Sequence, residues 1–195
     1  MKLISILAAA AAMAAIGAAA HAEGRLDKIK ANGELTLGYR DSSIPFSYLD
    51  DNQKPIGYSM DICHGIAAAI QKDLQLPSLK IKEVPVTSST RIPLVANGTV
   101  DLACGSATNN ADRQKQVSFA PTTFVTATRF AALKKSGLKD LGDFHGKTVV
   151  STAGTSNLRW LTRVNAEQKL GMRIIPAKDH SQAFLTVSSG RAAAF

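Results

Sequence analysis

Two hydroxyl side chains and an arginine follow a short apolar segment near the middle of the chain. Residues 100–104 have the pattern of a strand that breaks at Gly105, and Ser106, Thr108 and Arg113 follow it. The hydroxyls and backbone N–H groups of such a turn can hold a small anion. A guanidinium matches a carboxylate with two parallel hydrogen bonds. The segment is therefore a candidate anion site, and a solvated loop is the alternative interpretation.

Further cations and hydroxyls follow the other strands that the pattern predicts. Arg40 comes directly after the alternating segment 34–39, and Ser88 and Arg91 come after the apolar segment 79–84. The order strand, helix, strand, helix, strand predicts a parallel α/β sheet, with loops gathered at the carboxyl ends of its strands. Binding sites of open α/β sheets lie at this edge. Surface ion pairs and helix caps are the alternative roles for these side chains.

The elements that would position these residues are placed by hydrophobic periodicity and by Gly and Pro signals. In the first half we expect strands at 34–39, 79–84 and 100–104, and helices at 26–31, 60–74 and 87–98. The second of these helices, which Ser59 can cap, should bury Ile62, Ile66, Ala69, Ile70 and Leu74. In the second half we expect a crossing strand at 119–133, strands at 147–151 and 172–176, helices after 139, 154 and 179, and the start of a strand at 191–195.

Length and composition describe an ordinary globular protein. The chain has 195 residues, enough for one large domain or two small lobes, and it is 45% hydrophobic and 19% charged. Its net charge of +8 comes from scattered Lys and Arg residues, with no run longer than Lys134–Lys135 and no nucleic-acid motif. We therefore expect no nucleic-acid partner, and the charge weakly favours an anionic ligand.

The N-terminus has the pattern of a secretory signal peptide. Lys2 precedes an uncharged, alanine-rich run, and Ala20-His21-Ala22 is a small-residue cleavage signal. We expect cleavage after Ala22 and a soluble mature chain outside the cytoplasm. A membrane anchor is the alternative interpretation, because the apolar run is nearly long enough to span a bilayer.

Cys63 and Cys104 are the only cysteines of the chain. An exported protein can join them in a disulfide, and two buried free thiols are the alternative. No metal site is expected, because the four histidines are far apart and no Cys-x-x-Cys motif is present. No cofactor is expected either.

Several phrases of the sequence resemble the periplasmic solute-binding proteins of ABC transporters, and in particular their glutamate/aspartate-binding branch. The phrases lie at 35–48, 57–61, 87–94, 104–116 and 173–180, and the likeness extends over residues 24–195. The resemblance implies a two-lobed, type II periplasmic-binding-protein-like α/β fold. Residues 1–22 would be the signal peptide, 23–123 the N-terminal part of lobe 1, and 124–195 an incomplete lobe 2. The rest of lobe 2 and the return to lobe 1 would be missing from this chain.

The resemblance also implies a role for each candidate residue in a cleft between the lobes. Arg113, Ser106 and Thr108 match the group that holds the α-carboxylate and the amino group of an amino acid. Arg40, Ser88, Arg91 and His180 match the residues that hold a side-chain carboxylate. Thr155 matches a further carboxylate donor at a helix N-terminus. Helix caps, solvated helix charges and surface positions are the alternatives for these residues.

The function implied is a periplasmic receptor that binds L-glutamate or L-aspartate and delivers it to an inner-membrane ABC permease. It would act as a monomer, without enzymatic chemistry. Two carboxylates entering a partly desolvated cleft need several charged donors, which agrees with three arginines at strand ends. One alternative is an enzyme on the same fold, such as a cyclohexadienyl dehydratase, with Asp41, Asp112 and His180 as its candidate acids or bases. Another is an extracytoplasmic sensor domain.

Overall fold

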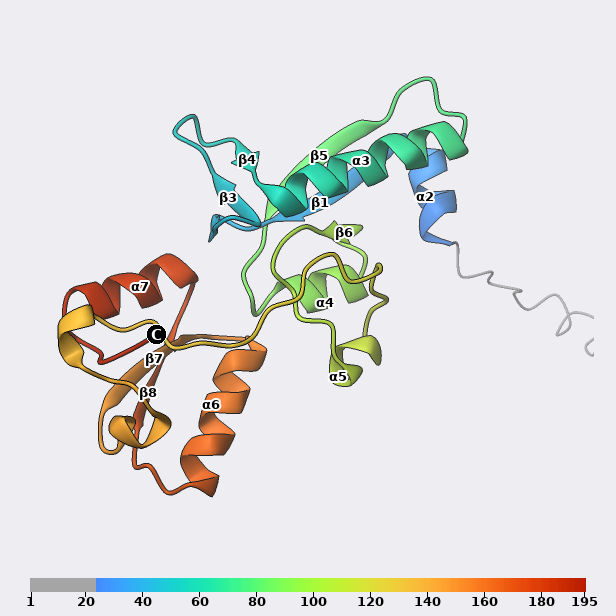
Figure 1. The fold of residues 1–195 in the computed structure, drawn as a ribbon. Coiled ribbons are helices and arrows are strands. Elements are labelled where there is room, and N and C mark those ends of the chain that lie inside the picture. Colours follow the sequence, from blue (N-terminus) through green and yellow to red (C-terminus); the bar gives the residue numbers. More distant parts are fainter. Residues whose placement is uncertain (1–23) are drawn as a thin grey trace, which may run out of the picture.

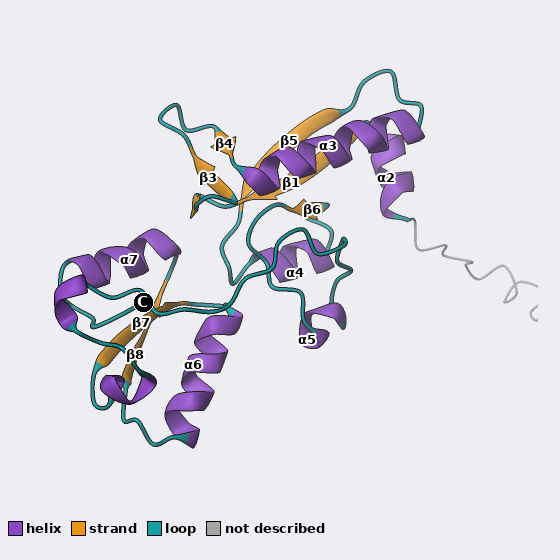
Figure 2. Cartoon of the chain, viewed as in Figure 1, coloured by secondary structure: helices purple, strands orange, loops and turns teal. Residues whose placement is uncertain are grey.

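The computed structural model of the protein describes residues 24–195, which fold as two α/β bodies joined by extended chain (Figure 1). The first body carries the elements from α2 to α5, and the second carries β7, β8, α6 and α7. Helices cover strands in both bodies, and a large share of the chain is loop (Figure 2). The predicted signal peptide lies outside the described residues. None of the helices within residues 24–195 has both the length and the apolar character needed to cross a bilayer.

A parallel sheet of three strands forms the centre of the first body, in the order β5 (Lys80–Pro85), β1 (Glu34–Tyr39) and β6 (Leu102–Ala103). Leu35 and Leu37 alternate along β1 and are fully buried. They pack with side chains from α2 (Arg25–Asn32) and α3 (Tyr58–Asp73), so both helices contribute to one core cluster. The predicted parallel sheet is confirmed, and β6 is shorter than the predicted strand.

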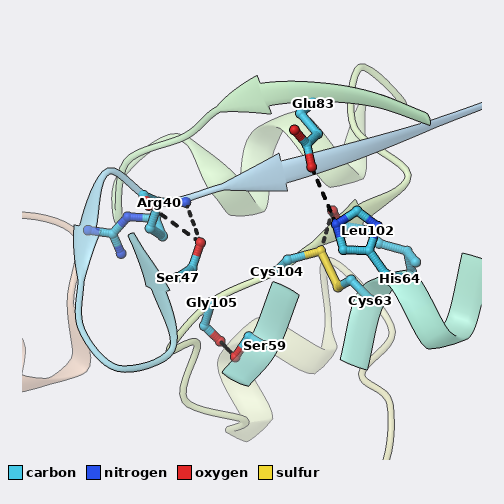
Figure 3. The surroundings of a disulfide bond; sticks show 9 residues. All are labelled: Arg40, Ser47, Ser59, Cys63, His64, Glu83, Leu102, Cys104 and Gly105. Atoms are coloured by element: carbon cyan, nitrogen blue, oxygen red, sulfur yellow. Dashed lines mark hydrogen bonds and ion pairs between the residues drawn. A yellow bond between two sulfur atoms is a disulfide. The ribbon is translucent and has the colours of Figure 1, made fainter. Parts of the chain in front are cut away.

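Helix α3 buries a face that only partly matches the predicted one, since Ile70 and Leu74 pack against the core cluster as expected. Its buried residues are Met60, Cys63 and Ala67, whereas Ile62 and Ile66 are only partly buried and Ala69 is exposed. Cys63 is joined to Cys104, directly after β6, by a disulfide with a Cα–Cα distance of 6.2 Å (Figure 3). The face of α3 that carries Cys63 meets the sheet, where Cys63 and Cys104 belong to one core cluster. The prediction was therefore right for Ile70 and Leu74 and wrong for the other three residues, because the apolar pattern left out Cys63.

The start of α3 also differs from the prediction. Gly57 is the N-cap residue, and Ser59 lies inside the first turn, where its hydroxyl donates to the carbonyl oxygen of Gly105 at 3.3 Å. Ser59 therefore connects the helix to the loop after β6 and does not cap it. Residues 42–56, predicted as loop and turn, contain a small antiparallel sheet of β2 (Ser42–Ser43), β3 (Ser47–Leu49) and β4 (Pro55–Ile56).

The remaining helices of the first body are short. Helix α4 (Arg91–Ala96) follows a turn at 88–90. Helix α5 (Ala111–Gln114) is capped by the side chain of Asn110, which accepts from the backbone N–H of Arg113. Arg91 and Arg113 are thus fixed by the first and last turns of two short helices beside the carboxyl edge of the sheet.

The segment 119–133 is not the predicted crossing strand. It is extended but unpaired over most of its length, and Ala132 alone forms a bridge, with Ala194. Val125 is 87% exposed, although the segment is rich in β-branched and aromatic residues. A strand needs a neighbouring edge to accept its backbone N–H groups, and the described residues offer one only at the end of this segment.

The second body repeats the α/β pattern with a parallel pair of strands, β7 (Thr148–Thr152) and β8 (Arg173–Ala177). Helix α6 (Ser156–Glu167) packs Leu161 and Val164 into one core cluster, and α7 (His180–Ser188) packs Ala183 and Val187 into another. Two short 3-10 turns, η2 (Lys134–Ser136) and η3 (Leu141–Phe144), precede β7. Instead of a new strand, residues 191–195 form a single bridged position at Ala194, which pairs with Val149 and Ala132.

Candidate functional site

A pocket of about 280 Å³ lies between the two bodies. Residues of the first body, the connecting segment and the second body line it together. Its lining includes five of the eight residues that the sequence singled out: Arg91, Ser106, Thr108, Thr155 and His180. The carboxyl ends of β1, β5, β6 and β7 all lead into this region, which is the edge that the topology predicted for a binding site.

Arg91 lines the pocket with a buried guanidinium that has few hydrogen-bond partners. It is 3% exposed, and its Nε and Nη1 atoms have no hydrogen-bond acceptor among residues 24–195. Burial, with the nearby cations Arg113 and Arg40, lowers its pKa to about 9. A buried guanidinium without acceptors is unfavourable unless an anion joins it. The expected alternative, a surface ion pair, does not fit this position.

Arg40 stands next to it at the end of β1 and is 2% exposed. Its backbone N–H donates to Ser47 Oγ at 2.8 Å, which fixes the turn, while its Nη1 has no acceptor among residues 24–195. Burial lowers the pKa of Arg40 and outweighs the opposite effect of Asp179 and Asp41. Gly105 passes close by, because a Cβ there would lie 2.9 Å from Arg40 Cγ. Figure 3 shows Arg40, Ser47 and Gly105 together at this end of the sheet.

Arg113 spans the two bodies. Its Nη1 donates to the carbonyl oxygen of Thr108 at 2.8 Å, and its Nη2 donates to that of Gly154, in the second body, at 3.1 Å. Burial, together with the charge of Arg159, lowers its pKa. The side chain is buried, which excludes the solvated helix charge that was its alternative interpretation.

The hydroxyl groups fall into two sets. Ser88 Oγ is buried without a partner among residues 24–195, so it is a free donor three residues before Arg91 in the chain. Ser106 Oγ is shared with Ser43 Oγ at 2.6 Å, and Thr108 Oγ1 accepts from Ser156 Oγ at 3.0 Å. The latter pair connects the two bodies at the rim of the pocket.

Thr155 acts as the N-cap of α6. Its Oγ1 accepts from the backbone N–H of Leu158 at 3.1 Å and donates to the carbonyl oxygen of Thr152 at 2.6 Å. Because its only hydroxyl proton is used, Thr155 contributes to the pocket by fixing the N-terminus of α6, where backbone N–H groups and the helix dipole favour an anion. The capping role and the pocket position coexist at this residue.

His180 is the first residue of α7 and reaches the pocket from the second body. Its Nδ1 lies 2.7 Å from Thr152 Oγ1, and the preceding Asp179 caps the helix by accepting from Gln182 N–H at 2.8 Å. Burial, with the charges of Arg40 and Arg91, lowers the pKa of His180 to about 4. The imidazole is therefore neutral at pH 7, and it can donate or accept one hydrogen bond at its second nitrogen.

The lining residues within 24–195 include one arginine, one histidine, several hydroxyl side chains and no Asp or Glu. Asp41 and Asp112, the carboxylates considered for an enzyme, are exposed at the surface, and Asp112 pairs with Lys115 at 3.8 Å. In the same described part of the chain, no group of three His, Cys, Asp or Glu side chains could hold a metal ion. The arrangement suits a small anion with hydrogen-bonding groups.

The structure brings all eight predicted residues to this region, although not all line the pocket directly. Arg40, Ser88 and Arg113 are buried and do not belong to its lining, and the two arginines among them are close enough to Arg91 to lower its pKa. Sequence reasoning missed other polar lining residues and partners: Ser43, Thr126, Thr128, Ser151, Thr152, Ser156 and Asn157. Thr152 could have been found by the strand-end rule, whereas Thr126 and Thr128 were hidden by the incorrect assignment of a strand.

The comparison with protein families gives one match that covers most of the chain. The family described as "Bacterial extracellular solute-binding proteins, family 3" matches residues 35–187. An "L-glutamate/L-aspartate-binding protein" of Pseudomonas aeruginosa is 51% identical over 195 residues, which is 100% of this chain and 65% of the relative. A "Glutamate/aspartate import solute-binding protein" of Escherichia coli K12 is 49% identical over 193 residues, covering 98% of this chain and 64% of the relative.

Solved structures agree with this match in fold. The P235GK mutant of ArgBP from T. maritima superimposes with a TM-score of 0.77 at 25% sequence identity, covering 88% of this chain and 70% of that one. The chain thus spans about two thirds of the length of the curated relatives, 65% of the P. aeruginosa protein and 64% of the E. coli protein.

Proposed function

Because this chain belongs to the bacterial extracellular solute-binding proteins, family 3, we propose that the pocket between its two bodies binds an acidic amino acid, L-glutamate or L-aspartate. The relatives that match over the whole chain are named for these two ligands. The ligand carries two carboxylates and an ammonium group, so it needs separate partners at its two ends.

One observation carries the proposal. The guanidinium of Arg91 and the hydroxyl of Ser88 are buried. Arg91 Nε, Arg91 Nη1 and Ser88 Oγ have no hydrogen-bond partner among residues 24–195. Arg40 adds a third set of buried donors in the same region. A carboxylate is an acceptor with room for several such bonds, and it would compensate the buried charge. A neutral amide in its place has one acceptor oxygen instead of two and carries no charge, so it would pair fewer of these donors and leave the buried cations uncompensated.

The proposed roles divide between the two ends of the ligand. Arg113, Ser106 and Thr108 hold the α-carboxylate and the amino group, while Arg40, Ser88, Arg91 and His180 hold the side-chain carboxylate. Thr155 supports a carboxylate through the N-terminus of α6, which it caps. The two hydrogen bonds of the Arg113 guanidinium, to the carbonyl oxygens of Thr108 and Gly154, support its role in holding the α-carboxylate. They fix the orientation of the guanidinium, so its remaining N–H donors are also held in place.

We propose that residues 23–123 form lobe 1 and residues 124–195 the described part of lobe 2. The separate core clusters of the two bodies support this division. The protein would be exported, cleaved after Ala22 and active as a monomer in the periplasm, where it passes its ligand to an inner-membrane ABC permease. It performs no chemistry in this proposal. Of the three candidate acids or bases for the enzyme alternative, Asp41 and Asp112 are exposed, and only His180 lines the pocket. The lining contains no Asp or Glu that could act with it as an acid–base pair, which argues against the enzyme alternative.

Calorimetry on the purified protein tests the proposal. L-glutamate, L-aspartate and L-glutamine are titrated separately at pH 7. We expect binding of at least one acidic amino acid, at least about tenfold tighter than L-glutamine, since each lost charge-assisted hydrogen bond weakens binding by roughly 1.5–3 kcal/mol. Equal affinity for L-glutamate and L-glutamine, or no binding of either acidic ligand, contradicts the proposal.

A further inference from the structure

The backbones of the two bodies meet at Gly154, in the turn between β7 and α6. A Cβ built on Gly154 would lie 2.5 Å from Cα and 2.7 Å from the backbone nitrogen of Ser89, in the turn before α4. Side-chain carbons do not approach backbone atoms this closely, and backbone cannot move aside as a flexible side chain can. Gly154 also has a φ of +73°, in the region that favours glycine.

Two hydrogen bonds between the bodies surround this contact. The carbonyl oxygen of Gly154 accepts from Arg113 Nη2 at 3.1 Å, and two residues later Ser156 Oγ donates to Thr108 Oγ1 at 3.0 Å. The other terminal nitrogen of Arg113, Nη1, donates to the carbonyl oxygen of Thr108 at 2.8 Å. Gly154, Ser156, Thr108 and Arg113 therefore form one connected contact between the bodies, at the edge of the pocket.

We propose that Gly154 is a positioning residue for closure of the two bodies, and that its missing Cβ is what allows Arg113 to bridge them. This inference rests on the proposed function, since closure serves to hold the ligand. Gly154 supplies a carbonyl oxygen that orients the guanidinium while its other donors face the ligand. A residue that never touches the ligand thus controls how tightly the ligand is held.

The geometry indicates what a methyl group would do here. Ordinary contact between a Cβ and another atom begins at 3.4 Å, so Ser89 and an alanine at this position would have to separate by about 1 Å from the spacing of 2.5 Å. A movement of that size would lengthen the Arg113–Gly154 bond beyond the usual range for N–H···O hydrogen bonds, about 2.7–3.2 Å. The backbone contact and the bridge would therefore be lost together.

The test compares Gly154→Ala with Gly190→Ala in the purified protein. Gly190 follows α7 in the same body and has nearly the same φ, +74°, but nothing lies within 4 Å of the Cβ that would be added. The two variants thus introduce the same backbone strain, and only one introduces the contact with Ser89. Affinity for L-glutamate and L-aspartate is measured by calorimetry, and the radius of gyration by small-angle X-ray scattering with and without ligand. Thermal unfolding checks that both variants are folded.

We expect Gly154→Ala to bind at least about tenfold more weakly than Gly190→Ala, a difference of ~1.4 kcal/mol, and to have the larger radius of gyration with or without ligand. Equal effects of the two substitutions would show that backbone strain alone matters and would overturn the inference. So would a Gly154→Ala variant that binds and compacts like the wild type. If the wild type binds neither acidic amino acid, the proposed function fails instead, and the scattering comparison without ligand still tests the contact.

Discussion

His180 and Arg91 line one pocket from different bodies of the protein, and the imidazole is kept neutral there. Burial, with the charges of Arg40 and Arg91, lowers the pKa of His180 to about 4. The same two cations are the groups that a ligand carboxylate would neutralise. The protonation of His180 is therefore coupled to the charge that occupies the pocket.

Ligand binding should consequently raise the pKa of His180. Burial is the main cause of the lowered pKa and remains when a ligand binds, but an added carboxylate opposes the field of Arg40 and Arg91. The pKa should therefore rise above about 4 without regaining 6.5, and binding at pH 5 should take up a fraction of a proton. Calorimetry in buffers of different ionisation enthalpy measures the number of protons taken up on binding. His180→Gln should reduce it to near zero, while uptake that persists in the variant would contradict the assignment to His180.

The free energy of unfolding should depend on pH through the same residue. The folded pKa of about 4 lies below the unfolded value of 6.5, so the unfolded chain binds more protons between these values. Stability should therefore fall as the pH decreases from 6.5 to 4, by on the order of 1–3 kcal/mol after allowance for solvent screening. Urea unfolding at pH 7 and pH 5 checks this, with His180→Gln as the control. A pH dependence unchanged in that variant would refute it.

Arg91 should increase the affinity for the ligand and lower the free energy of unfolding of the ligand-free protein. Arg91→Met removes a buried cation whose Nε and Nη1 lack acceptors among residues 24–195, so we expect the unfolding free energy without ligand to rise by about 1–2 kcal/mol. Binding of acidic amino acids should be lost in the same variant.

Arg25 provides the matched control for this experiment. It is paired with Asp101 at 3.2 Å and also donates to the carbonyl oxygens of Gly98 and Val95. Arg25→Met should therefore destabilise the protein and leave the ligand affinity unchanged. Urea unfolding gives the free energy of unfolding of both variants. If Arg91→Met lost as much stability as Arg25→Met, the prediction that the buried Arg91 charge is destabilising would be wrong.

The Cys63–Cys104 bridge should contribute much of the stability of the first body. It joins residues that are 41 positions apart, and a loop of this size corresponds to about 3–4 kcal/mol in the chain-entropy description. The Cys63→Ala/Cys104→Ala variant should lose stability of that order in urea unfolding. Two titratable thiols in the mature, non-reduced protein would contradict the bridge itself.

Local patterns predicted much of the fold. Alternation at Leu35 and Leu37 placed β1 to the residue, because one face of that strand is buried against helices. The two-lobed α/β fold and the family, inferred from short phrases such as 104–116, are confirmed by the matching relatives and solved structures. Strand pairing that depends on residues far apart in the sequence could not be predicted from local patterns. Segment 119–133 has the composition of a strand, but its backbone finds a partner only at Ala132.

The site was predicted to a similar degree. Residues at strand ends, such as Arg40 and Arg91, followed from topology because parallel strands deliver their carboxyl ends to one edge. Gly154 and Ser156 did not, since their importance comes from contacts between the bodies with residues such as Ser89 and Thr108, which no local pattern encodes. The buried face of α3 was only partly predicted for a related reason, because the contact of Cys63 is with Cys104, a residue distant in the chain.

The most direct test of the account compares Arg91→Ala with Arg113→Ala, with calorimetric affinities for L-glutamate and L-glutamine measured in each. We expect Arg91→Ala to weaken L-glutamate binding by at least about a hundredfold, or ~2.7 kcal/mol, and to reduce the ratio of the affinity for L-glutamate to that for L-glutamine. Arg113→Ala should weaken both ligands alike. If the two variants lose the same affinity for both ligands, the pocket does not hold two carboxylates with separate cations, and the central claim is wrong.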